Sequence, residues 1–235
     1  MKKLLILAAL GACGGDLDPP WQLDHDRIVA VRATPPGIVF DEESEIDALI
    51  AVKGGPTMTL SPELVTVLSP PSLAGQLRQQ DGKWFVAAPD EAQLAPARQE
   101  LGLGPTDPVP LELGVSYAGG TLIGLKSVKL GISAVNPTLS PMTINAAPAP
   151  SSDVEIVVGS LIDVPLEITA LETEEINWMT SCGTMHDFDL PKATLRVEED
   201  DPLEGELAVV LRDEVGGVTW QVWKIHADPP PLPAE

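Results

Sequence analysis

The residues whose types and spacing could do chemistry are gathered in one short stretch, CGTMHDFD at residues 182–189. Cys182 and His186 stand four residues apart, and Asp187 and Asp189 follow. A thiolate, an imidazole and two carboxylates are ligands that zinc accepts, so this stretch is a candidate metal site. Structural zinc sites use a second ligand pair at its own short spacing, and the sequence has none. We therefore predict a loop between two strands, with the Cys182 thiol buried and no bound metal or cofactor.

Other motifs of catalysis and calcium binding are absent from the sequence. The stretch from Gly114 to Ala118 (GVSYA) lacks the final glycine of a nucleophile elbow and falls in a predicted strand. No phosphate loop or dinucleotide fingerprint occurs. The acidic run from Glu198 to Asp201 fits a solvated turn better than a calcium loop. We expect no enzyme, and a hydrolase, which would need a cleft with perturbed His or Asp side chains, is the least favoured class.

Two tryptophans in the last apolar segment, VTWQVWKI at residues 218–225, are candidates for binding. In a strand, Val218, Trp220 and Val222 share one face, whereas Trp223 and Ile225 share the other, so one tryptophan is expected to be more exposed. An exposed Trp223 would offer a sugar-stacking platform or a partner contact. The alternative, which we favour, is that Trp223 packs against the first domain or under the Pro-rich tail.

The N-terminal segment has the order of an export signal. Lys2 and Lys3 precede an apolar core of seven residues, Leu4–Leu10, and small residues lead to Cys13. Seven helical residues rise about 10 Å, far less than the roughly 30 Å of hydrocarbon in a bilayer. The tetrapeptide LGAC ending at Cys13 resembles a bacterial lipobox, which implies removal of residues 1–12 and acylation of Cys13. By resemblance to lipoprotein sorting patterns, Gly14 implies the outer membrane, on either its periplasmic or its surface-exposed face.

The composition indicates a folded, strongly acidic body. The chain carries 35 acidic against 14 basic residues, a formal charge of −21, and 44% of its residues are hydrophobic. This charge repels nucleic acid and anionic lipid headgroups, so basic partners or divalent cations are the expected electrostatic counterparts. If Cys13 carries lipid, Cys182 has no second cysteine with which to form a disulfide. No later segment has the apolar length of a membrane span, so lipid alone would attach the chain to the membrane.

Strand-like segments must position these residues, and they fall into two series along the chain. The first series predicts a β-sandwich domain at residues 24–135, which follows an acylated tether at 13–23. The segment EIDALIAVK (45–53) alternates apolar and polar residues, as a half-buried strand does. The preceding PPGIVFDEES is typical of a connection where the chain leaves one sheet for another. A helical patch at 90–102 is expected to form two short helices, because Pro96 interrupts it. The expected strands are 27–34, 45–53, 63–68, 83–87, 109–117 and 121–133, the last two joined at Gly119-Gly120.

A second series follows a Pro-rich stretch at 136–152, which is either a linker or, at 142–146, the first strand of the next domain. Its expected strands are 154–158, 163–170, 175–180, 193–198, 205–213 and 217–226. Short strands at this spacing, separated by turn residues, are typical of a sandwich, here at residues 153–228. The tail at 229–235 is expected to be extended polyproline II.

Two segments of this second series, INWMTSCG (176–183) and ELAVVLRDEVGGVTWQVWKI (206–225), resemble bacterial immunoglobulin-like and PKD-like domains. The resemblance implies that Trp178 is the core aromatic residue and that Asp213 and Gly216-Gly217 form the turn of a final hairpin. The whole chain resembles uncharacterised surface lipoproteins of gliding Gram-negative bacteria. That resemblance implies an all-β fold of two immunoglobulin-like β-sandwich domains in tandem.

Together these features predict a lipid-anchored, non-enzymatic protein of the cell envelope. It would act as a structural or protein-binding module with an envelope protein as partner, using sandwich loops, an edge strand or electrostatics. The alternative is a surface module that binds glycan or divalent cations through Trp223 or the acidic loops.

Overall fold

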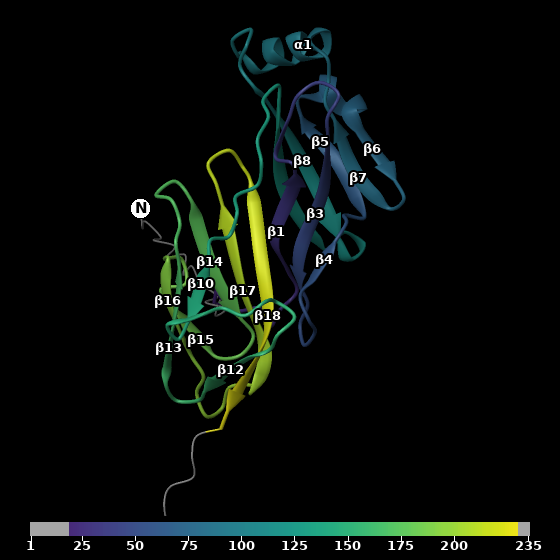
Figure 1. The fold of residues 1–235 in the computed structure, drawn as a ribbon. Coiled ribbons are helices and arrows are strands. Elements are labelled where there is room, and N and C mark those ends of the chain that lie inside the picture. Colours follow the sequence, from purple (N-terminus) through teal and green to yellow (C-terminus); the bar gives the residue numbers. More distant parts are fainter. Residues whose placement is uncertain (1–18, 230–235) are drawn as a thin grey trace, which may run out of the picture.

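A computed structural model describes residues 19–229, which form an all-β body of four sheets with one α-helix (Figure 1). The predicted lipidation site Cys13, the signal 1–12 and all but the first residue of the tail 229–235 lie outside these described residues. Between residues 19 and 229, no helix has the length and apolar character needed to cross a membrane.

The N-terminal half, residues 24–135, consists of two facing sheets. The strands of the first sheet are, in spatial order, β1 (Arg27–Thr34), β3 (Glu43–Ala51), β7 (Lys83–Ala87) and β6 (Leu77–Gln80), with β4 (Met58–Leu60) paired to β3. The strands of the second are β2 (Gly37–Ile38), β9 (Leu122–Leu130), β8 (Val109–Tyr117) and β5 (Leu64–Ser69). Short 3₁₀ helices lie at Pro71–Gln76 and Ala118–Gly120. Because β1 pairs with β3 and β2 pairs in parallel with β9, the chain leaves one sheet for the other between them, as predicted.

The C-terminal half, residues 136–229, repeats this topology with an unrelated sequence. Its first sheet contains, in spatial order, β11 (Ala147–Pro148), β10 (Met142–Ile144), β13 (Asp163–Ile168), β16 (Lys192–Arg196) and β15 (Thr184–His186). Its second contains β12 (Ile156–Gly159), β18 (Val218–Asp228), β17 (Glu204–Arg212) and β14 (Glu175–Thr180). The parallel pair of β12 with β18 corresponds to that of β2 with β9. This order, repeated in both halves, is the arrangement of an immunoglobulin-like sandwich.

Three apolar clusters hold the four sheets in a stack. One fills the space between the two sheets of the N-terminal half, and another does so in the C-terminal half. The third lies between the halves, where β1 and β3 face β14, β17 and β18 (Figure 1). The alternate residues of β17 explain the central position of its sheet, because Leu207 and Val209 enter one cluster and Ala208 and Val210 enter another. The existence of two separate domains stays a prediction, since this third cluster joins the halves.

The helix differs from the prediction of two short helices. A single helix, α1 (Glu91–Leu101), begins at Asp90, whose side chain accepts a hydrogen bond from the Gln93 amide in a capping box. It ends at Gly102, whose φ of 66° suits a left-handed cap. Pro96 lies inside the helix and deprives it of one backbone hydrogen bond. The helix continues through it because residues on either side, Leu94 and Ala97, are buried against the core.

The predicted boundaries need two corrections. Residues 21–23, assigned to a tether, lie against the edge of β14, where the Leu23 amide donates to the Thr180 carbonyl at 2.9 Å. Apolar side chains draw this segment onto the body: Leu23 is buried in the third cluster and Trp21 packs against the C-terminal core. The segment 136–152 is likewise not a simple linker, because it contains β10 and β11. Strand β10 lies within 142–146, where the alternative interpretation placed the first strand of the next domain.

Candidate functional site

The structure separates the candidate metal ligands of residues 182–189. Cys182 is fully buried, and its thiol donates to the carbonyl oxygen of Pro202 at 2.9 Å. His186 ends strand β15 on the exposed side, and Asp187 and Asp189 follow in the next turn. Within residues 19–229, no three His, Cys, Asp or Glu side chains form a group that could hold a metal ion. The loop predicted between β14 and β16 thus contains a short strand, with the thiol buried before it and the imidazole exposed at its end.

The environment of Cys182 fits the predicted buried thiol. Burial raises the pKa of Cys182 to about 11, and the Asp201 carboxylate adds to the increase. A thiol with a raised pKa is a poor nucleophile and a poor metal ligand, because both roles require the thiolate.

Trp223 is not the exposed residue of the last strand, so its assignment as a ligand or partner contact is wrong. Only 1% of Trp223 is exposed, and its indole N–H donates to the Pro150 carbonyl at 2.9 Å inside the C-terminal half. The predicted division of the strand into two faces is confirmed, but both faces are covered. Trp220, on the other face, lies against the N-terminal half, with its ring centroid 3.9 Å from the Arg32 guanidinium carbon.

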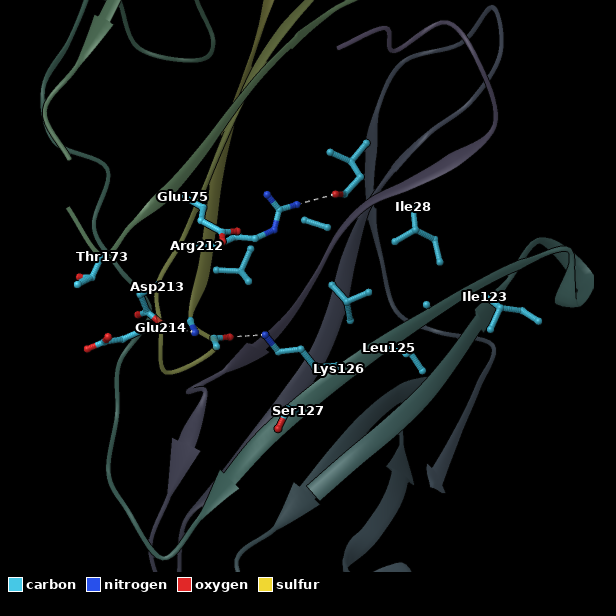
Figure 2. Close-up of a pocket in the computed structure, with 17 residues that line it drawn as sticks. Ile28, Ile123, Leu125, Lys126, Ser127, Thr173, Glu175, Arg212, Asp213 and Glu214 are labelled. Atoms are coloured by element: carbon cyan, nitrogen blue, oxygen red, sulfur yellow. Dashed lines mark hydrogen bonds between the residues drawn. The ribbon is translucent and has the colours of Figure 1, made fainter. Parts of the chain in front are cut away.

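A cleft between the halves is the candidate functional site, and we call it the junction cleft (Figure 2). Its volume is about 560 Å³, within the range of ligand-binding clefts. One wall is formed by β1 from Ile28 to Val31 and by β9 from Ile123 to Ser127. The other is formed by Thr173, Glu175 and the β17–β18 turn. The turn residue Asp213 fixes that turn, since its carboxylate accepts hydrogen bonds from the Val215 and Gly217 amides.

Lys126 is the buried charge of the junction cleft. Only 7% of it is exposed, and its ammonium donates to the Gly216 carbonyl across the cleft (Figure 2). Burial lowers the pKa of Lys126 to about 8, although the nearby Asp213 carboxylate acts in the opposite direction. An ammonium has three N–H donors, so one protein acceptor leaves it under-paired. The contact joins β9 of one half to the β17–β18 turn of the other.

Arg212 is the second cation of the junction cleft and is also turned into the protein. Its guanidinium donates to the Asn177 side chain and, at 3.0 Å, to the Val29 carbonyl of the N-terminal half. Burial lowers the pKa of Arg212. The carboxylates of Glu175 and Glu214, which also line the cleft, are exposed, and Glu175 counteracts part of the effect of burial on the pKa of Arg212.

The exposed part of the β9 wall is apolar. Ile123 is 74% exposed and Leu125 is 70% exposed, two residues apart on the same side of the strand. The junction cleft therefore combines apolar side chains with an acidic margin. The sequence did contain a signal of this site: in LIGLKSVKL, Lys126 takes an inward position among alternating apolar residues, while Ile123 and Leu125 take outward ones.

Comparisons with known proteins identify no family. No protein-family model matches the chain, and no curated protein matches it. Among solved structures, murine CEACAM1b is similar over 86% of this chain and 100% of its own, at 11% identity and a TM-score of 0.29. The tandem Ig repeats of Dlar are similar over 86% of this chain and 98% of theirs, at 13% identity and a TM-score of 0.28.

A nucleoside hydrolase-related hypothetical protein from Saccharophagus degradans is similar over 41% of this chain, at 10% identity and a TM-score of 0.31. The match covers only 26% of that protein's length. At these identities and TM-scores the neighbours say nothing of function, and the immunoglobulin-like assignment depends on the strand order itself.

Proposed function

We propose that this protein is a lipid-anchored, non-enzymatic protein-binding module of the bacterial outer membrane. The observation that carries the binding role is the exposed apolar pair Ile123 and Leu125 on β9, beside the junction cleft. Exposed apolar side chains that adjoin each other and a cleft mark interaction sites more often than singly exposed ones do. The formal charge of −21 favours a partner with basic groups around the contact.

The anchoring role is supported by the first residues of the chain. The positive start, the apolar core and the LGAC tetrapeptide ending at Cys13 follow the order of a lipoprotein signal. In this proposal, acylated Cys13 holds the protein on the membrane and the stacked sheets present β9 to an envelope partner. Because residues 21–23 lie on the body, the spacer between lipid and body is shorter than the predicted tether of 13–23.

Glycan binding is not supported as a second function. The alternative assigned Trp223 to stacking on a sugar, and that side chain is buried in the C-terminal core. The acidic run Glu198–Asp201 is used internally in part, because the Glu198 amide donates to the Asp201 carboxylate at 2.8 Å.

The anchor is tested by intact mass and membrane fractionation after expression in a Gram-negative host, beside a Cys13→Ser variant. We expect a lipid-sized mass increment and outer-membrane flotation for the original chain only. If both proteins lack the mass increment and are soluble, the proposed anchor is refuted.

The binding role is tested in the same cells with a photo-crosslinking residue placed at Leu125 and, as a matched control, at Val157, which is also exposed. We expect one discrete adduct with an envelope protein from position 125 and none from position 157. Equal adducts from both positions, or none from either, would refute a partner at β9.

A further inference from the structure

We infer that the junction cleft binds an extended peptide segment that carries both cationic and apolar side chains. This inference deepens the proposed protein-binding function, on which it rests, by naming the chemistry of the partner. It is argued from the walls of the cleft, its charges and the unpaired edge of β9.

The apolar requirement comes from the β9 wall. Ile123 and Leu125 line the junction cleft and are largely exposed. Since successive outward positions of a strand are two residues apart, their side chains lie on the same side of β9, and Figure 2 shows both along this strand; we call them the apolar strip. A bound chain would remove this strip from water by placing alternate apolar side chains over it.

The cationic requirement comes from the opposite wall. Glu175 begins β14, and Glu214 lies in the β17–β18 turn; both are exposed at the cleft. Lys126 faces the Gly216 carbonyl, and Arg212 faces Val29 and Asn177 while Glu175 acts on it electrostatically. With Asp213, three carboxylates line the cleft against these two cations, so its formal charge is negative, and lysine or arginine on the ligand is its complement.

The extended conformation is indicated by the edge of β9. The amides of Lys129 and Gly131 donate to Pro36 and Ile38 on the side of β9 away from β8, at 2.9 Å each. Residues at odd positions thus direct their backbone groups to that side. In the described chain, β2 pairs only with Lys129 and Leu130, so the backbone groups of Ile123, Leu125 and Ser127 have no partner strand. An unpaired edge is the usual site at which a peptide is added as a strand.

Two polar groups of the cleft, the Ser127 hydroxyl and the Lys126 ammonium, also indicate a ligand. The hydroxyl of Ser127 is buried, and no described residue forms a hydrogen bond with it. Lys126, with most of its side chain buried, has a single protein acceptor for three donors. Buried polar groups in folded proteins are seldom left unpaired, and backbone carbonyls of an added strand would pair with both.

The test uses the purified full chain and a synthetic peptide of alternating leucine and lysine as the probe. Its affinity is measured by isothermal titration calorimetry, beside a peptide of alternating leucine and glutamate and one of alternating glycine and lysine. We expect the leucine-lysine peptide to bind at least about tenfold more tightly than either comparison peptide. Equal binding of the glycine-lysine peptide would overturn the apolar part of the inference.

Paired variants separate the cleft from the general acidity of the protein. Glu175→Gln with Glu214→Gln removes the acidic margin, and Ile123→Ser with Leu125→Ser removes the apolar strip. Each pair should weaken binding about tenfold. The matched controls are Glu199→Gln with Asp200→Asn, which removes two exposed charges from another turn, and Val157→Ser. Equal loss in cleft and control variants would show nonspecific attraction and overturn the inference.

Failure of this inference and failure of the proposed function give different experimental results. No peptide binding, together with a discrete crosslink from position 125 in cells, would refute a cationic apolar ligand and leave the partner site standing. No peptide binding and no crosslink would refute both.

Discussion

Replacement of Lys126 by methionine tests the energetic description of the junction cleft. The buried side chain has its pKa lowered from 10.5 to about 8 mainly by desolvation. Unfolding returns the lysine to water, so between these pH values the unfolded chain binds a proton that the folded chain does not. Stability therefore rises with pH across this window, and the cost of burying the charge is fully present below pH 8. At 1.36 kcal/mol per pH unit, that cost is about 3 kcal/mol.

Methionine keeps the aliphatic stem and removes the charge, but it leaves the Gly216 carbonyl without its donor. At pH 7 the stability gained by removing the buried charge is nearly offset by the cost of the unpaired carbonyl, which is about 1–3 kcal/mol. The informative quantity is the change with pH. Between pH 7 and pH 10 the free energy of unfolding of the original protein should rise by about 2–3 kcal/mol relative to that of Lys126→Met.

The assay is urea unfolding followed by tryptophan fluorescence at both pH values, with the exposed Lys224→Met as control. Burial also raises the pKa of Cys182 and of Tyr117, so both groups reduce stability at alkaline pH. They do so equally in both proteins and cancel in the difference. Parallel pH dependence of the original protein and Lys126→Met would refute a desolvated ammonium in the cleft.

Three further predictions concern the packed interior. The Cys182 thiol should resist an aromatic disulfide reagent in the native protein and react at once in urea, because it is fully buried; fast native labelling would contradict its placement. Arg32→Ala should lower the free energy of unfolding by about 1–2 kcal/mol, because it removes the contact with the Trp220 ring and the hydrogen bonds to Asp47 at 2.6 and 3.0 Å. An unchanged urea midpoint would argue against this contact between the halves. Trp178→Ala should lower the free energy of unfolding by about 3–5 kcal/mol or prevent folding. A loss below about 1 kcal/mol would contradict the placement of Trp178 in the core.

Local patterns in the sequence predicted most of the strands because each such pattern has a local physical cause. The alternation in residues 45–53 corresponds closely to β3, and the segment KWFVA is β7 as predicted. The turn at Asp213 and Gly216 has its cause in the residues themselves, an aspartate that accepts neighbouring amides and a glycine with a φ of 90°. Trp178 is fully buried on β14, as the resemblance to immunoglobulin-like domains implied.

The candidate site could not be predicted in the same way, because its contacts join residues far apart in the chain. Lys126 and Gly216 are 90 positions apart, and Arg212 and Val29 are 183 apart. Periodicity assigned Trp220 and Trp223 to opposite faces but could not identify the layer that covers each. Likewise, Pro19-Pro20 suggested a free tether, whereas Leu23, three residues after Pro20, is held in an apolar cluster to which both halves contribute.

The central sheet explains why the proposed partner is expected at β9. If the halves were independent modules, the outer face of β14, β17 and β18 would meet water and would be polar. Instead Met179, Ala208 and Val210 are buried on that face against Val29 and Leu49 of the N-terminal half. The corresponding sheet of the N-terminal half, with β9, has no such cover and retains exposed Ile123 and Leu125. The same position in the repeated topology is thus closed within the molecule in one half and open in the other, and the open face adjoins the edge of β9 at which the inferred peptide would be added as a strand.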